Sequence, residues 1–340
     1  MKKLLNTLYV STQGVYLHRE GETVVAEREK QVVLRLPIHT LSAIVCFGNV
    51  LVSPFLMGLC AERGVLVSFL TENGRPLARV EGGKTGNVLL RVAQIEAARD
   101  PAKCAAIARS FVIGKVLNAR NVLQRRLRDH GDDAACASAV SSLANVAQRL
   151  KNANDVEVIR GLEGEAASDY FAAFNSLIVA QKDDFRMEGR TRRPPRDPMN
   201  ALLSFLYVLL ANDCAGAAKS VGLDAQVGFL HALRSGRASL AFDLMEEFRA
   251  FFADRVALSL VNRGQIRKKD FKFTESGAVE MSETARKTVL VEWQNRKKDE
   301  VVHPFLNERV AAGLLPFVQA QLLAKHLRND LDAYPPFLVK

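Results

Sequence analysis

Residues 82–86 read Gly82-Gly83-Lys84-Thr85-Gly86, and the chain changes character at this stretch. Short β-branched runs precede it, whereas the residues beyond it follow a helical period with almost no strand-like alternation. The full GxxxxGK[ST] spacing of a phosphate loop is absent, so a hinge is favoured here. The sequence therefore predicts an α+β multidomain fold, with a small β-rich N-terminal domain over 1–85, a linker over 86–100 and a larger all-α domain over 101–340.

The N-terminal part contains seven short runs that resemble strands. They lie at 7–10, 15–18, 23–26, 32–36, 43–47, 65–70 and 77–80. Glu20-Gly21-Glu22 is expected to form a hairpin tip, and Ser53 to Arg63 a helix that has Pro54 at its first position.

The C-terminal part is predicted to consist of helices separated by loops. The expected helices are 88–98, 102–128, 134–151, 156–181, 199–220, 240–262 and 284–298. Asp155 and Asp197-Pro198 are start signals for two of them. The most apolar stretch, 201–211, is shorter than the roughly 18 residues of a membrane span and is interpreted as a buried helix.

Composition restricts the class of protein and of partner. The 340 residues include 47 Lys and Arg against 37 Asp and Glu, which gives a net charge of +10. Because 48% of the residues are hydrophobic, the sequence is not that of a disordered or fibrous protein. Basic charge suits nucleic acid, although surface lysines that serve solubility explain it equally well. The five cysteines are scattered singly, and Asn6 and Thr7 interrupt the basic start before a signal peptide could form. These features predict a cytoplasmic protein without a membrane segment.

Two segments of the helical half carry candidate chemistry, and the first is Arg160 to Phe171. Gly161 and Gly164 each cost a helix roughly 1 kcal/mol relative to alanine, so they need a compensating reason such as close approach of another backbone. Glu163 is expected at the edge of the apolar face, among small residues. It is either a solvated surface carboxylate or part of a site.

The second segment joins Gly228-Phe229-Leu230-His231 to the helix Leu240 to Arg249. Asp243, Glu246 and Glu247 are spaced i, i+3 and i+4, which predicts that they share one helical face. Their repulsion could be relieved by Arg237, Arg249 or solvent, or by a divalent cation to which His231 adds a nitrogen. Two carboxylates and one imidazole would suit Mn²⁺ or Mg²⁺ better than a structural zinc.

With these motifs the chain resembles the CRISPR-associated spacer integrases, the proteins numbered one in those systems. The resemblance rests on Gly161 to Gly164 with Ala166, Ala167, Tyr170 and Phe171, on Gly228 to His231, and on Leu240 to Arg249. It extends over nearly the whole chain. The length and the motif 243–249 resemble the type I-C branch most.

The resemblance implies a metal-dependent DNA endonuclease and integrase whose catalytic domain is the helical one. It implies that Glu163, His231 and Glu246 hold Mn²⁺ or Mg²⁺, with Asp243 at a further acidic position of the catalytic motif. A 3′-hydroxyl of a short DNA fragment would attack a phosphodiester of a CRISPR repeat, and water as nucleophile would give endonuclease activity. It further implies a homodimer, whose contacts involve the β-rich domain, that binds double-stranded DNA and the small CRISPR-associated protein numbered two.

Two basic runs are candidate DNA contacts. They comprise Arg190, Arg192, Arg193 and Arg196 before the 199–220 helix, and Arg263, Arg267, Lys268 and Lys269 after the acidic helix. A purely solvated loop is the alternative for the first run, and helical surface charge explains a third run at 120–128 about as well as DNA does. Tyr207 is interpreted as a core tyrosine.

Two other functions are compatible with the residues. One is a non-catalytic DNA-binding scaffold subunit, which would bind DNA in a salt-sensitive way with no response to metal. The other is a single-chain repair nuclease that needs neither the small partner nor a repeat.

Overall fold

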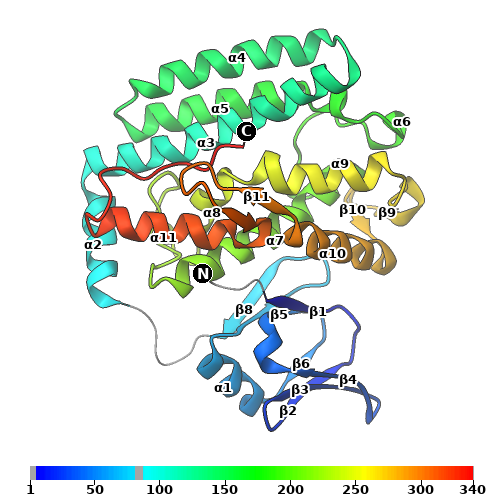
Figure 1. Cartoon of the computed structure of the whole chain (residues 1–340). Coiled ribbons are helices and arrows are strands. Elements are labelled where there is room, and N and C mark those ends of the chain that lie inside the picture. The colour runs from blue at the N-terminus through cyan, green and yellow to red at the C-terminus, as the bar shows by residue number, and fades with distance from the viewer. Residues whose placement is uncertain (1–4, 81–86, 340) are drawn as a thin grey trace. The chain divides into compact units, whose positions relative to one another are not determined.

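The computed structural model describes residues 5–80 and 87–339 (Figure 1). The hinge predicted at 82–86 lies outside these residues. The chain forms two compact units, one of Met1–Thr85 with Glu283–Lys298 and one of Gly86–Ser282 with Asp299–Lys340. The helix 283–298 thus groups with the β-rich unit although it follows most of the other in sequence.

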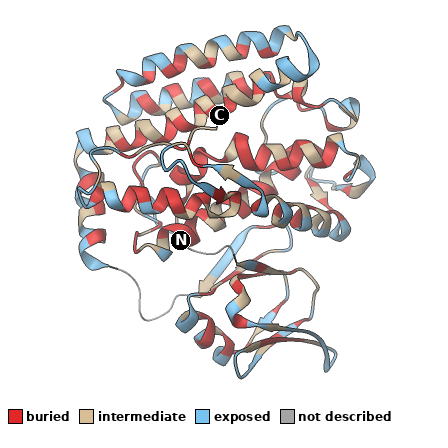
Figure 2. Cartoon of the chain, in the orientation of Figure 1, coloured by how far each residue is buried: buried red, intermediate tan, exposed pale blue. Residues whose placement is uncertain are grey.

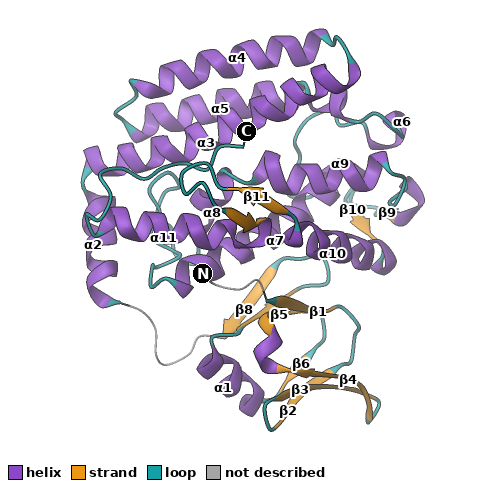
Figure 3. Ribbon diagram, viewed as in Figure 1, coloured by secondary structure: helices purple, strands orange, loops and turns teal. Residues whose placement is uncertain are grey.

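The β-rich unit contains two four-stranded sheets (Figure 3). In the first, β1 (Asn6–Val10), β5 (Leu41–Phe47) and β7 (Leu66–Leu70) run parallel, and β8 (Pro76–Val80) pairs antiparallel with β7. The second has the order β4-β3-β2-β6, from β4 (Gln31–Pro37), β3 (Thr23–Arg28), β2 (Tyr16–Glu20) and β6 (Leu51–Val52). The predicted hairpin tip joins β2 to β3, with Gly21 at φ 56°.

One apolar core holds this unit together. Leu17, Ile44, Leu56 and Val67 are fully buried in it, contributed by both sheets and by α1 (Pro54–Arg63). Ser53 caps α1 as its sequence predicts, since its side chain accepts from the Leu56 N–H. The short helix η1 (Ile38–Thr40) precedes β5, and α10 (Glu283–Lys298) completes the unit.

The second unit is built from helices. They are α2 (Val88–Arg99), α3 (Pro101–His130), α4 (Ala134–Lys151), α5 (Val156–Ala172), α6 (Lys182–Phe185), α7 (Pro198–Ser220), α8 (Ser239–Glu246), α9 (Arg255–Asn262) and α11 (Leu315–Leu327). Short 3-10 turns lie at η2 (Phe174–Leu177), η4 (Lys268–Asp270) and η5 (Ala312–Leu314). Helix α2 takes up most of the segment predicted as a linker. A β-rich N-terminal part followed by a mostly helical part confirms the predicted fold class.

Helix starts follow the predicted capping signals. The Asp155 carboxylate accepts from the N–H groups of Glu157 and Val158 at the start of α5, at 2.8 and 3.0 Å. Asp197 accepts from the Asn200 N–H at 2.7 Å and precedes Pro198 at the start of α7. These caps fix where the two helices begin, and α5 carries Glu163.

Three local predictions for the helical unit were wrong. The helix expected over 240–262 is α8, then a π-helical turn (η3, Arg249–Asp254), then α9. The helix expected to reach residue 181 ends at Ala172. Two small antiparallel ribbons were not predicted: β9 (Phe271–Phe273) with β10 (Val279–Met281), and β11 (Glu300–Val302) with β12 (Arg309–Ala311).

Helix α7 lies in the core of this unit (Figure 2). It alone among the described helices has the length and apolarity of a membrane span, yet 72% of its most apolar window is buried inside the protein. Residues such as Leu202, Leu206 and Leu210 are buried on it. The prediction of a buried helix at 201–211 is therefore confirmed.

Candidate active site

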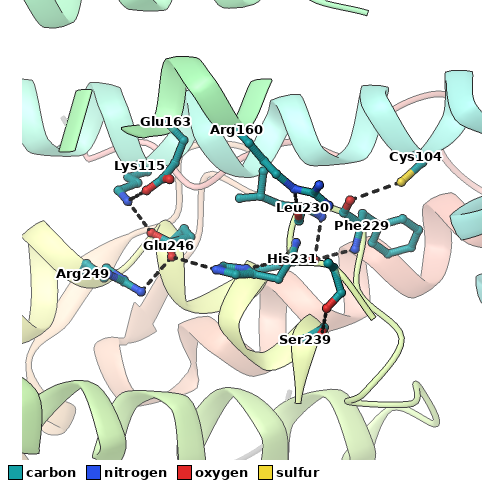
Figure 4. Close-up of polar contacts among 12 residues, drawn as sticks. Cys104, Lys115, Arg160, Glu163, Phe229, Leu230, His231, Ser239, Glu246 and Arg249 are labelled. Atoms are coloured by element: carbon teal, nitrogen blue, oxygen red, sulfur yellow. Dashed lines mark hydrogen bonds and ion pairs between the residues drawn. The ribbon is translucent and has the colours of Figure 1, made fainter. Parts of the chain in front are cut away.

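Helices α3, α5 and α8 bring two acidic side chains to one basic side chain. Glu163 projects from α5 and Glu246 from the end of α8, and Lys115 of α3 lies between them (Figure 4). The Lys115 Nζ forms ion pairs with Glu163 Oε1 and, at 2.8 Å, with Glu246 Oε2. The Glu163 and Glu246 carboxylates are 27% and 2% exposed, so one faces solvent and the other is enclosed.

Asp243 holds His231 in place. Its fully buried carboxylate accepts from the backbone N–H groups of Phe229, Leu230 and His231, at 2.6, 3.1 and 2.9 Å. The same carboxylate lies 2.7 Å from His231 Nδ1. A carboxylate only accepts, so Nδ1 carries a proton, and when the ring is neutral the lone pair of Nε2 is available to bind a cation. This Nε2 points toward Glu246, 3.9 Å from its Oε1.

Three side chains donate hydrogen bonds to the backbone carbonyls of the loop that carries His231. Arg160 Nε donates to the Leu230 carbonyl at 2.6 Å, and the Cys104 thiol to the Phe229 carbonyl at 3.2 Å. Ser239 Oγ donates to the Ala232 carbonyl at 3.0 Å. Both faces of the loop are thus bonded, which fixes the position from which the His231 ring projects (Figure 4).

Gly228 is required by this close packing, whereas the two glycines beside Glu163 are not. A Cβ at Gly228 would lie 2.7 Å from Asp243 Oδ2 and 2.8 Å from Ser239 Cβ. A Cβ at Gly161 or Gly164 would meet no atom within 4 Å. The expectation that another backbone approaches these two helical glycines is therefore wrong for the described part of the chain.

Substituting alanine at the two kinds of glycine is expected to have opposite effects on stability. Gly228→Ala should lower the free energy of unfolding by about 1–3 kcal/mol because the added methyl overlaps Asp243 and Ser239. Gly161→Ala should raise it by roughly 0.5–1 kcal/mol through helix propensity. Urea unfolding of both variants measures the difference. Equal stabilities would contradict the packing assigned to Gly228.

Glu246 is ionised by its surroundings. Burial alone would raise its pKa, but the charges of Arg249, Lys115 and His231 outweigh burial and hold the pKa of the carboxyl below its usual range. Arg249 Nη2 lies 2.9 Å from Glu246 Oε1. Glu246 therefore offers a charged carboxylate at neutral pH, the form that binds a cation.

Behind Arg249 lies a buried network around Tyr207. The Arg249 guanidinium stands 4.8 Å from the centre of the Tyr207 ring, and the Tyr207 hydroxyl donates to Asp254 at 2.7 Å. Tyr170 of α5 donates to the same carboxylate at 2.9 Å. Burial raises the pKa of Asp254 to about 6. Tyr207 is buried, as expected, and supports the residue that bonds Glu246.

Glu247 does not share the face of Asp243 and Glu246, so this prediction was wrong. Helix α8 ends at Glu246, and the Glu247 carboxylate accepts from the Tyr334 hydroxyl at 2.7 Å and the Phe337 N–H at 2.9 Å. Gln319 Nε2 donates to it at 2.8 Å. Burial raises its pKa to about 8 against these three donors. Glu247 thus anchors the C-terminal segment behind the site.

The C-terminal segment is also bonded to α3. Asn118 Nδ2 donates to the carbonyls of Glu247 and Phe337, at 2.8 and 2.9 Å, and Asn118 Oδ1 accepts from the Val339 N–H at 2.8 Å. Residues 334–339 therefore form a strap, here called the C-terminal strap, between α3 and the end of α8.

The basic residues predicted to contact DNA differ in their surroundings. Arg190 is enclosed: its guanidinium donates to Asn200 Oδ1 at 2.6 Å and Ser204 Oγ at 3.1 Å, and it stands 5.3 Å from the Tyr207 ring centre. The others, Arg192, Arg193, Arg196, Arg263, Arg267, Lys268 and Lys269, are exposed. Arg190 therefore has partners inside the protein, and Lys268 lies 3.4 Å from Asp184 Oδ1, but all seven of the other side chains are exposed to solvent.

Lys115 and Arg160 were not identified as site residues from the sequence. A signal for Lys115 exists, because Phe111, Lys115 and Asn118 align on α3 at spacings of four and three, with two polar residues in a buried stripe. Arg160 gives no such signal, since its partner is a carbonyl 70 positions away.

The donor set fits a hard divalent cation. Glu163 and Glu246 supply oxygens and His231 supplies Nε2, while Asp243 fixes the tautomer in the manner of a carboxylate behind a metal-bound histidine. As they stand, no three His, Cys, Asp or Glu side chains of residues 5–80 and 87–339 are grouped closely enough to hold an ion. The Lys115 ammonium lies between the two glutamates.

A family model and a relative of known name both match this chain over most of its length. The family model of CRISPR associated protein Cas1 matches residues 8–295. CRISPR-associated endonuclease Cas1 1 of Chlorobaculum tepidum is 52% identical over 341 residues, covering 99% of each chain.

Solved structures share the fold. A casposase bound to an integration product superposes with a TM-score of 0.84 at 23% identity, covering 97% of this chain and 93% of its own. A chain of a Cas6-RT-Cas1–Cas2 complex gives 0.82 at 23% identity, covering 100% of this chain and 37% of its own. At these identities the likeness is one of fold.

Proposed function

Because the chain belongs to the Cas1 family, the endonucleases and integrases of CRISPR adaptation, we propose that Glu163, His231 and Glu246 form its active site. The observation that carries this proposal is the orientation of His231. Asp243 binds its Nδ1 and leaves Nε2 directed at Glu246. Nε2 and Glu246 Oε1 thus face one another 3.9 Å apart, an arrangement in which both can contact a cation bound between them.

Cas1 proteins are generally metal-dependent, and in this chain Glu163, Glu246 and His231 would hold Mn²⁺ or Mg²⁺. The bound ion would supply Lewis-acid activation of the attacking oxygen and neutralise charge on the phosphate. Asp243 keeps the proton on Nδ1, and Arg249 orients the Glu246 carboxylate. The loop bonds from Arg160 and Cys104 keep the ring at a fixed distance from α8.

The reaction is a phosphodiester exchange. The 3′-hydroxyl oxygen of the incoming fragment forms a bond to a phosphorus at the edge of a CRISPR repeat, and the existing phosphorus–oxygen bond to the neighbouring nucleotide breaks. With water as the nucleophile the same exchange is endonuclease cleavage. Arg249 places a positive charge beside Glu246, and a phosphate bound next to this carboxylate would meet that charge.

The partners are proposed on the same basis. The casposase that shares this fold is bound to an integration product, and another chain of this fold belongs to a Cas1–Cas2 complex. With the family membership, these likenesses support the proposal that the protein binds double-stranded DNA and Cas2, and the resemblance adds the proposal of a homodimer. The exposed residues of the two predicted runs, Arg192, Arg193, Arg196, Arg263, Arg267, Lys268 and Lys269, are proposed to contact the DNA backbone. Cytoplasmic location and the type I-C subtype complete the proposal.

An integration assay tests the function directly. Purified protein and its Cas2 partner are incubated with a supercoiled plasmid that carries the repeat, a short fragment and Mn²⁺. A fragment with free 3′-hydroxyls should be inserted, while a 3′-deoxy fragment or added EDTA should reduce insertion to background. Salt-sensitive DNA binding that is indifferent to EDTA, without insertion, would favour the scaffold function instead.

A further inference from the structure

Lys115 occupies the space between two of the three proposed metal ligands. Its side chain is only 12% exposed, and its Nζ pairs with both Glu163 Oε1 and Glu246 Oε2. Helix α3 supplies it, whereas the proposed ligands come from α5, α8 and the loop at 231. A positive charge from a third helix therefore stands where the proposed ion would bind.

We infer that the Lys115 ammonium is an internal substitute for the divalent cation: it neutralises Glu163 and Glu246 in the metal-free protein and must leave when the ion binds. This inference rests on the proposed function, because it takes these two glutamates as metal ligands.

The geometry of the site supports this role. Glu246 is 2% exposed, and a buried carboxylate without a counterion is strongly destabilising. Arg249 neutralises part of this charge through Glu246 Oε1, at 2.9 Å. The second oxygen, Oε2, has Lys115 as its ion-pair partner at 2.8 Å.

A divalent ion and the ammonium cannot share these oxygens. An ion ligated by Glu163 and Glu246 would bind oxygens that Lys115 now contacts, and would bring three positive charges within a few ångströms. Arg249 is fixed by Glu246 and the Tyr207 ring, so it is poorly placed to move. Lysine has a flexible four-carbon stem with a single charged nitrogen, so we expect the Lys115 side chain, and not Arg249, to move away from the glutamates when the ion binds.

Lys115 also lines a mostly apolar pocket whose other charged lining residues are Arg192, Arg249 and Asp254. Glu163 and Glu246 do not line this pocket, so it offers the lysine side chain space apart from the proposed ligands, with the Asp254 carboxylate as a partner.

The test measures Mn²⁺ affinity by calorimetry and melting temperature in EDTA for the full chain. Lys115→Met should bind Mn²⁺ roughly tenfold more tightly, because no ammonium competes for the carboxylates. It should also melt at a lower temperature than wild type in EDTA, and the difference should shrink at saturating Mn²⁺. Lys115→Arg keeps a charge and should bind Mn²⁺ no more tightly than wild type. Lys103→Met, an exposed lysine of the same helix, should change neither quantity.

Contrary results separate this inference from the proposed function. Unchanged or weaker Mn²⁺ binding by Lys115→Met, or an equal melting deficit with and without Mn²⁺, would make Lys115 an ordinary structural ion pair and overturn the inference. Glu163→Gln in otherwise wild-type protein tests the ligands themselves. If Glu163→Gln leaves Mn²⁺ binding intact, the proposed metal site is wrong. If Glu163→Gln abolishes Mn²⁺ binding but Lys115→Met does not bind Mn²⁺ more tightly, the metal site stands and only the displacement of Lys115 by the ion is wrong.

Discussion

Replacing His231 with alanine is expected to lower the rate of DNA integration by roughly 10³-fold, equivalent to about 4 kcal/mol of transition-state stabilisation. The substitution removes the Nε2 that faces Glu246, and the two glutamates contain no group that replaces it. Stability should fall by only about 1 kcal/mol, because the Asp243 carboxylate keeps its three backbone donors. Quantifying integration products against time, alongside urea unfolding, separates the two effects.

His130→Ala is the matched control for this experiment. His130 is an exposed histidine at the end of α3, far along that helix from Lys115, and its loss should leave the integration rate unchanged. Integration by His231→Ala at the rate of this control would remove His231 from the mechanism. A loss of activity accompanied by an equal loss of folded protein would assign His231 a structural role instead.

Asp243→Asn is expected to damage both the fold and the reaction. The fully buried carboxylate accepts from three backbone N–H groups and from His231 Nδ1, whereas an amide offers one accepting oxygen and turns an NH₂ group toward these donors. The free energy of unfolding should fall by about 3 kcal/mol or more. Integration should fall as well in the protein that remains folded, because His231 loses the partner that sets its tautomer.

Urea unfolding and integration assays at a temperature where the variant is folded measure these losses. Asp224→Asn serves as control, since that carboxylate accepts from the Gln226 N–H at a partly exposed turn and should tolerate the change to within about 1 kcal/mol. A stability of Asp243→Asn close to that of the control would contradict the role assigned to the Asp243 bonds.

Local signals in the sequence predicted much of this fold because they act over a few residues. Asp155 and Asp197 cap helices whose first N–H groups lie two or three positions away, and Gly21 turns a hairpin between adjacent strands. The break between α8 and α9 was missed because the apolar period continues through the π-helical turn. The grouping of α10 with the β-rich unit depends on contacts between residues far apart in sequence, which no periodicity encodes.

The sequence predicted those site residues whose side-chain type and helical spacing both indicated a shared position. Asp243 and Glu246 do lie beside His231, as the motif and helical spacing indicated. Glu247 was misplaced because its direction is set by Tyr334 and Phe337, nearly ninety positions later. For Lys115 the spacing from Phe111 and Asn118 indicates a buried stripe, but its partners Glu163 and Glu246 follow only from the packing of α3 against α5 and α8.

The C-terminal strap has a consequence for the order of events during synthesis. Glu247 follows directly on Glu246, and its carboxylate is completed by groups at 319, 334 and 337. A ribosome will have made every proposed catalytic residue before it makes the strap that encloses Glu247. The β-strands of the N-terminal unit can pair as they emerge, whereas the bonds of Glu247 wait for groups made about ninety positions later. A nascent chain therefore carries the proposed catalytic side chains before the strap behind them exists.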